Sequence, residues 1–280
     1  MIRFILITGL SLLEGILMTE PRERYRYRVT YEKRQPYLSQ IDILNVFRRT
    51  MRRADLPVSY SEGFNPQPLL SFGPALPVGF RAMAEQMEIR LDRDYEPVEL
   101  AGILRDNLPP AIGLVGVRRV ELKAPSINSS VVGAVYRFKM SEEDADICRR
   151  AALEAISSGT LPVTVMSKTG PQNRDQIGFL AEARAVGTDQ GFCLELELRT
   201  SDGNLPNTLP MVAALAQKHH DEGLMNPVRI ELLFKVLESD VDIAAGAVVE
   251  SAGESTVGAA ESAADQTAGV SGDARGEGES

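Results

Sequence analysis

The sequence has few of the residues that most metal and redox sites need. Its 280 residues include two cysteines, two histidines and no tryptophan. Cys148 and Cys193 are too few for a disulfide framework, a four-thiolate zinc site or an iron–sulfur cysteine triplet. The histidines are adjacent, His219 and His220, which disfavours a metal hydrolase with several imidazole ligands. We therefore predict that this chain binds no metal or cofactor, and that both cysteines are buried small residues.

Long apolar runs are nearly absent. Residues 1–18 form one such run, but Glu14 interrupts it and no small-residue cleavage site follows. A membrane span needs about 20 uninterrupted apolar residues, and a signal peptide has different flanks. A misassigned start codon explains the run as well as an anchor does. We predict that residues 1–21 are a misannotated or disordered extension, and that the protein is cytoplasmic and contacts no membrane.

Charge is spread unevenly. The formal net charge is −9, and residues 238–280 alone carry ten acidic residues and one base, which sum to the same −9. This end is rich in Ala, Gly and Ser without an aromatic residue or proline, a composition typical of disorder, so we predict a disordered acidic tail over residues 239–280. Residues 22–53, by contrast, carry ten Lys or Arg and three acidic residues. That basic segment indicates a surface that binds polyanions.

Hydrophobic periodicity predicts the same order of elements twice. In the first half, strands are expected at 24–33, 87–91 and 112–122, with helices at 39–54 and 97–107 around a Pro-rich stretch. In the second half, strands are expected at 131–140, 162–167, 180–186, 192–199 and 228–236, with helices at 142–157 and 207–217. Ser39 and Ser141 each precede a helix with an Asp three residues later, as in a capping box. The pattern favours an α+β fold of tandem ferredoxin-like (βαββαβ) domains with antiparallel sheets, at residues 22–126 and 127–238.

The first helix separates its residues into two faces. Ile43, Phe47 and Met51 share one arc at about 100° per residue. A second arc carries four arginines, Arg48, Arg49, Arg52 and Arg53. The preceding strand region adds Arg22, Arg24, Arg26 and Arg28. A solvated surface explains any single arginine, but a cluster also fits phosphate binding, because counterion release rewards several cations together.

The segment from Tyr60 to Gly79 is the most distinctive part of the chain. Four prolines, with Pro57 just upstream, and three glycines restrict its backbone to a fixed path. Two interpretations stay open: a Pro-rich connection packed over the sheet, or a stiff loop that presents polar groups to a ligand or partner. For the second, the candidate binding residues are Tyr60, Ser61, Glu62, Gly63, Phe64, Asn65, Pro66, Gln67 and Ser71.

These residues carry a family resemblance. RYRVTYEK, YLSQIDILNVFRRTMRRADLPVSYSEGFNPQPLLSFGPALPVG and EQMEIRLD resemble the opening of the radical SAM-linked protein family, an uncharacterised bacterial family. Its motif usually reads GFNPHP followed by a basic residue, whereas this chain has Gln67 and Leu69 at those places. The matching positions are Gly63, Phe64, Asn65, Pro66, Pro68, Ser71 and Phe72.

The resemblance implies a radical SAM partner that carries S-adenosylmethionine and a 4Fe-4S cluster. We therefore expect a non-catalytic accessory protein that works with this partner in RNA binding or modification. The alternative is a metal-independent endoribonuclease or RNA-modifying enzyme, because the order of elements is also similar to the RAMP-type endoribonucleases. For His219 and His220, the end of a helix explains the pair better than general acid–base catalysis.

Overall fold

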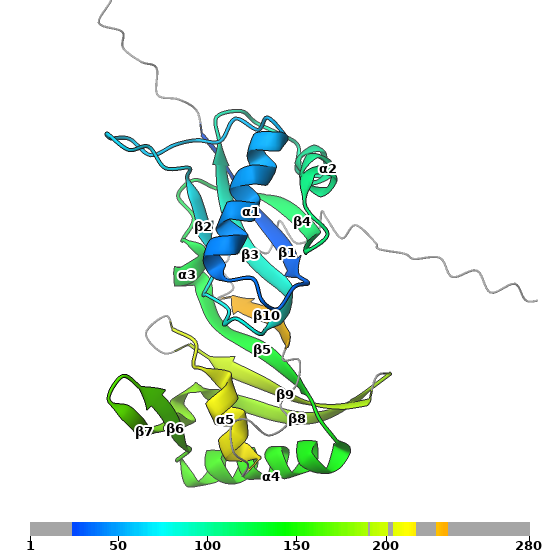
Figure 1. The fold of residues 1–280 in the computed structure, drawn as a ribbon, viewed down its shortest axis with the longest axis vertical. Coiled ribbons are helices and arrows are strands. Elements are labelled where there is room, and N and C mark those ends of the chain that lie inside the picture. The colour runs from blue at the N-terminus through cyan, green and yellow to red at the C-terminus, as the bar shows by residue number, and fades with distance from the viewer. Residues whose placement is uncertain (1–23, 190, 201–203, 217–227, 235–280) are drawn as a thin grey trace, which may run out of the picture.

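The computed structural model describes residues 24–189, 191–200, 204–216 and 228–234, the last without their side chains. Its first half contains four strands and two helices (Figure 1). These are β1 (Tyr25–Lys33), α1 (Gln40–Arg53), β2 (Leu70–Phe72), β3 (Arg81–Leu91), α2 (Pro97–Asn107) and β4 (Ile112–Val120). The predicted helices and strands of this half are present, and β2 is an additional short strand.

The second half begins with a one-turn helix, α3 (Ile127–Ser130), and holds the remaining strands. In chain order they are β5 (Val131–Lys139), α4 (Glu142–Ser158), β6 (Pro162–Ser167), β7 (Gly170–Asp175), the 3-10 turn η1 (Ile177–Phe179), β8 (Leu180–Thr188), β9 (Gly191–Arg199), α5 (Thr208–Leu215) and β10 (Val228–Phe234). The sequence did not predict β7. It pairs with β6 as a separate two-stranded hairpin.

The other strands form one continuous sheet in the order β4-β1-β3-β10-β5-β9-β8, with β2 added on β3. Nearly all pairings are antiparallel, so the predicted α+β fold with antiparallel sheets is confirmed. The exception is a short parallel contact between β10 and β3, at Val228 opposite Arg81 and Arg229 opposite Ala82. Because β10 pairs with β3 on one side and β5 on the other, it joins the two halves into a single sheet.

Each half has its own apolar core. In the first, α1 and α2 cover the face of β1 that carries Tyr27, Val29 and Tyr31, and the Tyr31 and Phe47 rings meet edge to face at 5.1 Å. In the second, α4 and α5 cover β5, β8 and β9. Phe80, which precedes β3, also packs into this second core, with its ring 6.1 Å from that of Tyr136.

The capping predicted for α1 is present. The Ser39 hydroxyl accepts a hydrogen bond from the Asp42 N–H (3.2 Å), and the Asp42 carboxylate accepts one from the Ser39 N–H (2.9 Å). These bonds from Ser39 to the charged carboxylate hold the pKa of Asp42 below its usual range. Ser141 likewise caps α4 by accepting from the Asp144 N–H (3.1 Å). The start of the arginine-bearing helix is therefore fixed by its own sequence.

Several sequence predictions fall outside the described residues. They concern the extension at residues 1–21, the tail at 239–280 and the adjacent histidines at 219 and 220. Cys148 and Cys193 are both buried and unbridged, as predicted. Within the part of the chain that the structure describes, no helix combines the length and apolarity that crossing a membrane requires.

Candidate functional site

Helix α1 presents a core face and a basic face, as its sequence predicts. Ile43, Phe47 and Met51 are buried in the first core. On the opposite side, Arg49, Arg52 and Arg53 are exposed and Arg48 is half-buried. None of these four arginines forms an ion pair with another described residue.

The distinctive segment after α1 forms a narrow hairpin. The Ser61 N–H donates to the Gln67 carbonyl (2.8 Å), and the Gln67 N–H donates to the Ser61 hydroxyl (2.9 Å). Tyr60 pairs with Pro68 below this point. At the tip, Gly63 has a φ of +120°, which side-chain-bearing residues rarely adopt. The hairpin projects from the body beside α1, as the light-blue loop in Figure 1 shows, whereas residues 70–72 of the same segment pair with β3 as β2.

The tip of this hairpin is exposed throughout. Phe64 stands fully in solvent, together with Glu62, Gly63, Asn65 and Pro66. Glu62 lies 3.6 Å from the Arg24 guanidinium, in an ion pair whose acid is almost entirely exposed. Such a pair contributes little to stability.

A cleft of about 350 Å³ separates α1 from the hairpin. Arg48 and Arg52 line its helix side, and Tyr60 and Gln67 line its hairpin side. The Arg48 Nη2 donates to the Gln67 Oε1 (3.1 Å), while the buried Arg48 Nε has no hydrogen-bond partner among the described residues. Asp55 adds one carboxylate to the lining. The cleft thus offers two guanidinium groups, which suit an oxyanion.

The structure brings together some of the predicted site residues and leaves others apart. Arg48, Arg52, Tyr60 and Gln67 meet in the arginine cleft, as we call this space. Arg49 and Arg53 continue the basic face outside it. Ser71 lies on β2, opposite Glu88 of β3 in the sheet, and is not part of the cleft.

The arginines of β1 do not extend the basic surface, contrary to our expectation. Arg26 and Arg28 are buried, and both donate to the buried Glu88 carboxylate, with shortest distances of 2.6 and 2.7 Å. Arg26 also donates to the Ala124 (2.6 Å) and Pro125 (2.9 Å) carbonyls, tying the segment after β4 to β1. A buried guanidinium needs such partners to offset its lost hydration. These two residues are therefore structural.

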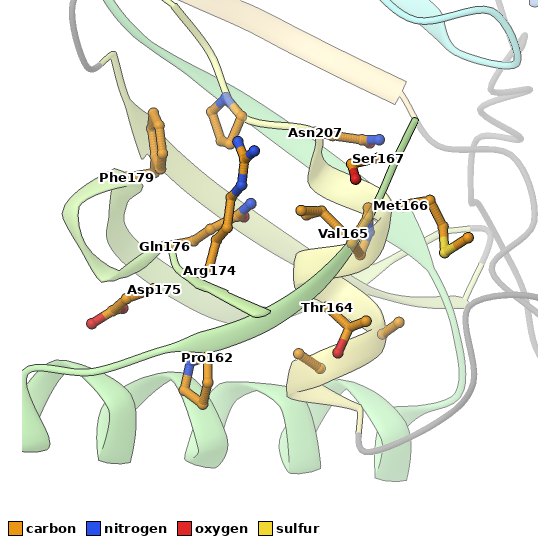
Figure 2. Close-up of a pocket in the computed structure, with 14 residues that line it drawn as sticks. Pro162, Thr164, Val165, Met166, Ser167, Arg174, Asp175, Gln176, Phe179 and Asn207 are labelled. Carbon is orange, nitrogen blue, oxygen red and sulfur yellow. The ribbon is translucent and has the colours of Figure 1, made fainter. Parts of the chain in front are cut away.

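The sequence missed a second, larger cleft of about 1250 Å³ between the β6–β7 hairpin and α5 (Figure 2). Figure 2 shows Arg174 and Gln176 on one side of it, with Val165 and Asn207 on the other. Among the described residues that line it, Arg174 is the one cation, and it already donates to Gln172 (3.1 Å). Strand β7 (GPQNRD), which forms part of this cleft, is polar along its length. It therefore lacks the apolar alternation by which a strand is recognised in a sequence. The arginine cleft is therefore the stronger candidate for an anionic ligand.

No described cluster of three or more His, Cys, Asp or Glu side chains could hold a metal ion. Burial raises the pKa of the Cys193 thiol, so this cysteine is less reactive than a free one.

Comparison with known proteins identifies the family. Residues 24–207 match the family described as "Uncharacterized protein conserved in bacteria (DUF2344)", and the chain belongs to it. That description mentions no radical SAM partner. The search of curated proteins found no match.

One solved structure with some similarity is the crystal structure of an unknown protein from Galdieria sulphuraria. It shares 15% identity with this chain, and the alignment covers 76% of this chain and 100% of that one with a TM-score of 0.23. A score this low supports no statement about fold or function.

Proposed function

We propose that this protein is a non-catalytic accessory protein that binds RNA through α1 and works with a radical SAM partner. The observation that carries the RNA-binding part is the arginine cleft, where Arg48 and Arg52 face Tyr60 and Gln67. Arg49 and Arg53 extend the same basic face, and none of the four arginines forms an ion pair with a described carboxylate. RNA phosphates would take the place of those missing counterions.

The radical SAM part of the proposal rests on the resemblance of residues 24–92 and of the GFNP motif. The two buried cysteines fit an accessory role, because they are too few to hold a 4Fe-4S cluster. S-adenosylmethionine and the cluster would be bound by the partner.

We also propose that each half of the chain is a ferredoxin-like unit. In the first half, the strand order β4-β1-β3-β2 supports this arrangement. In the second, β10-β5-β9-β8 has the same order once the β6–β7 hairpin is treated as an insertion. Units of this kind fit the domain ranges 22–126 and 127–238.

A double variant tests RNA binding. In R48Q/R52Q, affinity for single-stranded RNA should fall about tenfold at low salt. The slope of log affinity against log salt should shrink by about 1.4 if each arginine neutralises one phosphate. Fluorescence anisotropy with a labelled oligonucleotide measures both quantities.

The matched control is R149Q/R150Q, which removes one half-buried and one exposed arginine from α4. This variant should bind RNA like the parent. Equal losses in the two double variants would mean that net charge, and not the arginine cleft, determines binding. Cleavage of the RNA by the purified parent protein would instead favour the endoribonuclease alternative.

A further inference from the structure

Phe64 is the most exposed large apolar side chain among the described residues. It stands at the tip of the hairpin with its whole ring in solvent. Single exposed apolar residues are common on protein surfaces. A fully exposed aromatic ring at the end of a hydrogen-bonded hairpin is different, because the hairpin holds it away from the apolar cores.

Hydrogen bonds connect α1 to the hairpin that carries this ring. From the helix, the Arg48 Nη2 bonds to the Gln67 Oε1 (3.1 Å). The Gln67 Nε2 in turn bonds to the Asn65 Oδ1 (3.3 Å), next to Phe64 in the chain. A second ring, that of Tyr60, is half exposed and lines the arginine cleft. Cations and aromatic rings thus belong to one connected surface.

This combination of groups matches one kind of ligand. The arginines lack carboxylate partners in the described structure, so the surface complements a polyanion. The two exposed aromatic rings suit a ligand with flat apolar faces on which they can stack. An unpaired nucleotide supplies both, whereas a base pair hides its faces in the stack.

We propose that Phe64, supported by Tyr60, stacks against an unpaired RNA base while Arg48 and Arg52 hold phosphates of the same strand. The site therefore selects single-stranded over double-stranded RNA. This inference rests on the proposed RNA binding, and it adds the part of the RNA that the hairpin recognises.

The absence of tryptophan allows a direct test. In F64W, the indole at the hairpin tip is the sole tryptophan and should retain stacking. An A-rich single-stranded RNA of about twelve nucleotides should quench its fluorescence. L153W, on the exposed side of α4, is the control and should not respond.

Affinity measurements complete the test. F64A and F64L should each weaken binding of the A-rich RNA by about tenfold, because both remove the ring. Binding of an abasic oligonucleotide with the same number of phosphates should not change in these variants. An RNA duplex of equal length should bind the parent protein more weakly than the single strand.

The outcomes separate this inference from the proposed function. If F64W is not quenched and F64A binds like the parent while R48Q/R52Q still loses affinity, base stacking is wrong and phosphate binding stands. If the parent binds no RNA at all, both proposals fall. An indole that responds to a purified radical SAM partner but not to RNA would overturn base stacking and make the hairpin a protein-docking element.

Discussion

Gln176 holds a polar side chain where little water reaches it. Only 7% of the residue is exposed, and its Oε1 has no hydrogen-bond partner among the described residues. A buried group without a partner costs free energy, and an apolar residue of similar shape removes that cost. We expect Q176L to raise the free energy of unfolding by about 1 kcal/mol in urea titrations. Exposed Gln172 on the same hairpin is the control, and Q172L should change stability by less than about 0.5 kcal/mol. A clear loss of stability in Q176L would show that the amide is partnered.

Tyr27 illustrates a buried polar group that is fully satisfied. Its hydroxyl donates to the Asp94 carboxylate (2.7 Å) and accepts from the Tyr95 N–H (2.7 Å). Burial, followed by the bond to Asp94, raises the pKa of Tyr27 to about 12. Because the folded pKa exceeds the unfolded value of about 10, this group's contribution to stability is complete below pH 10 and is lost as the pH rises through 12.

The prediction for Tyr27 concerns the alkaline range. We expect the parent to lose roughly 2 kcal/mol more stability than Y27F between pH 10 and 12. Y27F itself should be destabilised by about 1 kcal/mol at pH 7, because it loses these hydrogen bonds. Denaturant unfolding at several pH values measures both effects. Parallel pH profiles for the two proteins would contradict the raised pKa.

At the scale of elements, the capping box of Ser39 and Asp42 links local sequence to the site. It fixes where α1 starts, and so the positions of the arginines along it. S39A should lower the free energy of unfolding at pH 7 by about 1 kcal/mol, as loss of an N-cap usually does. S126A, which removes the cap of the one-turn helix α3, should cost less because that helix is short.

The pH dependence of this cap follows from the lowered pKa of Asp42. A carboxyl group with a depressed folded pKa stabilises the protein above its unfolded pKa and loses that contribution as the pH falls through the folded value. Ser39 is the main cause of the shift, so the stability difference between parent and S39A should narrow below about pH 4. A difference that stays constant down to pH 2 would mean that the carboxylate does not take part in the cap.

Helices and strands with a clear hydrophobic periodicity were predictable from the sequence. Strands that depend only on hydrogen bonds from a neighbouring strand were not. The period of α1 and the alternation of β1 gave both their presence and their buried faces. In contrast, β2 has three residues and β7 is polar along its length, so each exists because a neighbouring strand supplies its hydrogen bonds. The Pro-rich sequence predicted a stiff segment, but the hairpin depends on the Ser61–Gln67 bonds, which local pattern does not encode.

At the scale of the whole molecule, the sequence pattern did not predict which surfaces become buried in the fold. Alternation placed Arg26 and Arg28 opposite Tyr27, but it could not show that Glu88 and the 121–125 segment would bury them. Similarly, the order of the longer strands along the chain was predictable, whereas the position of β10 between β3 and β5 in the sheet is a non-local contact. The basic face of α1 was identified correctly because helix period alone determines it.

The balance of charge over the whole chain leads to a last prediction. Residues 238–280 carry a net −9, and the arginine face offers the opposite charge in the same molecule. If RNA binds these arginines as proposed, the acidic residues should compete with it at low ionic strength. Replacing the ten acids of this segment by the corresponding amides, in the full-length chain, should raise RNA affinity by about tenfold near 0.05 M salt.

The gain should disappear near 0.5 M salt, because the Debye length falls from about 10 Å at 0.1 M to about 3 Å at 1 M. Keeping the segment at full length separates its charge from its bulk. Combining the amide substitutions with R48Q/R52Q tests where the charges act: if the competition is at the arginine cleft, the gain should be largely lost in the combined variant. The same gain in both backgrounds would instead mean that the acidic segment repels RNA from the molecule as a whole.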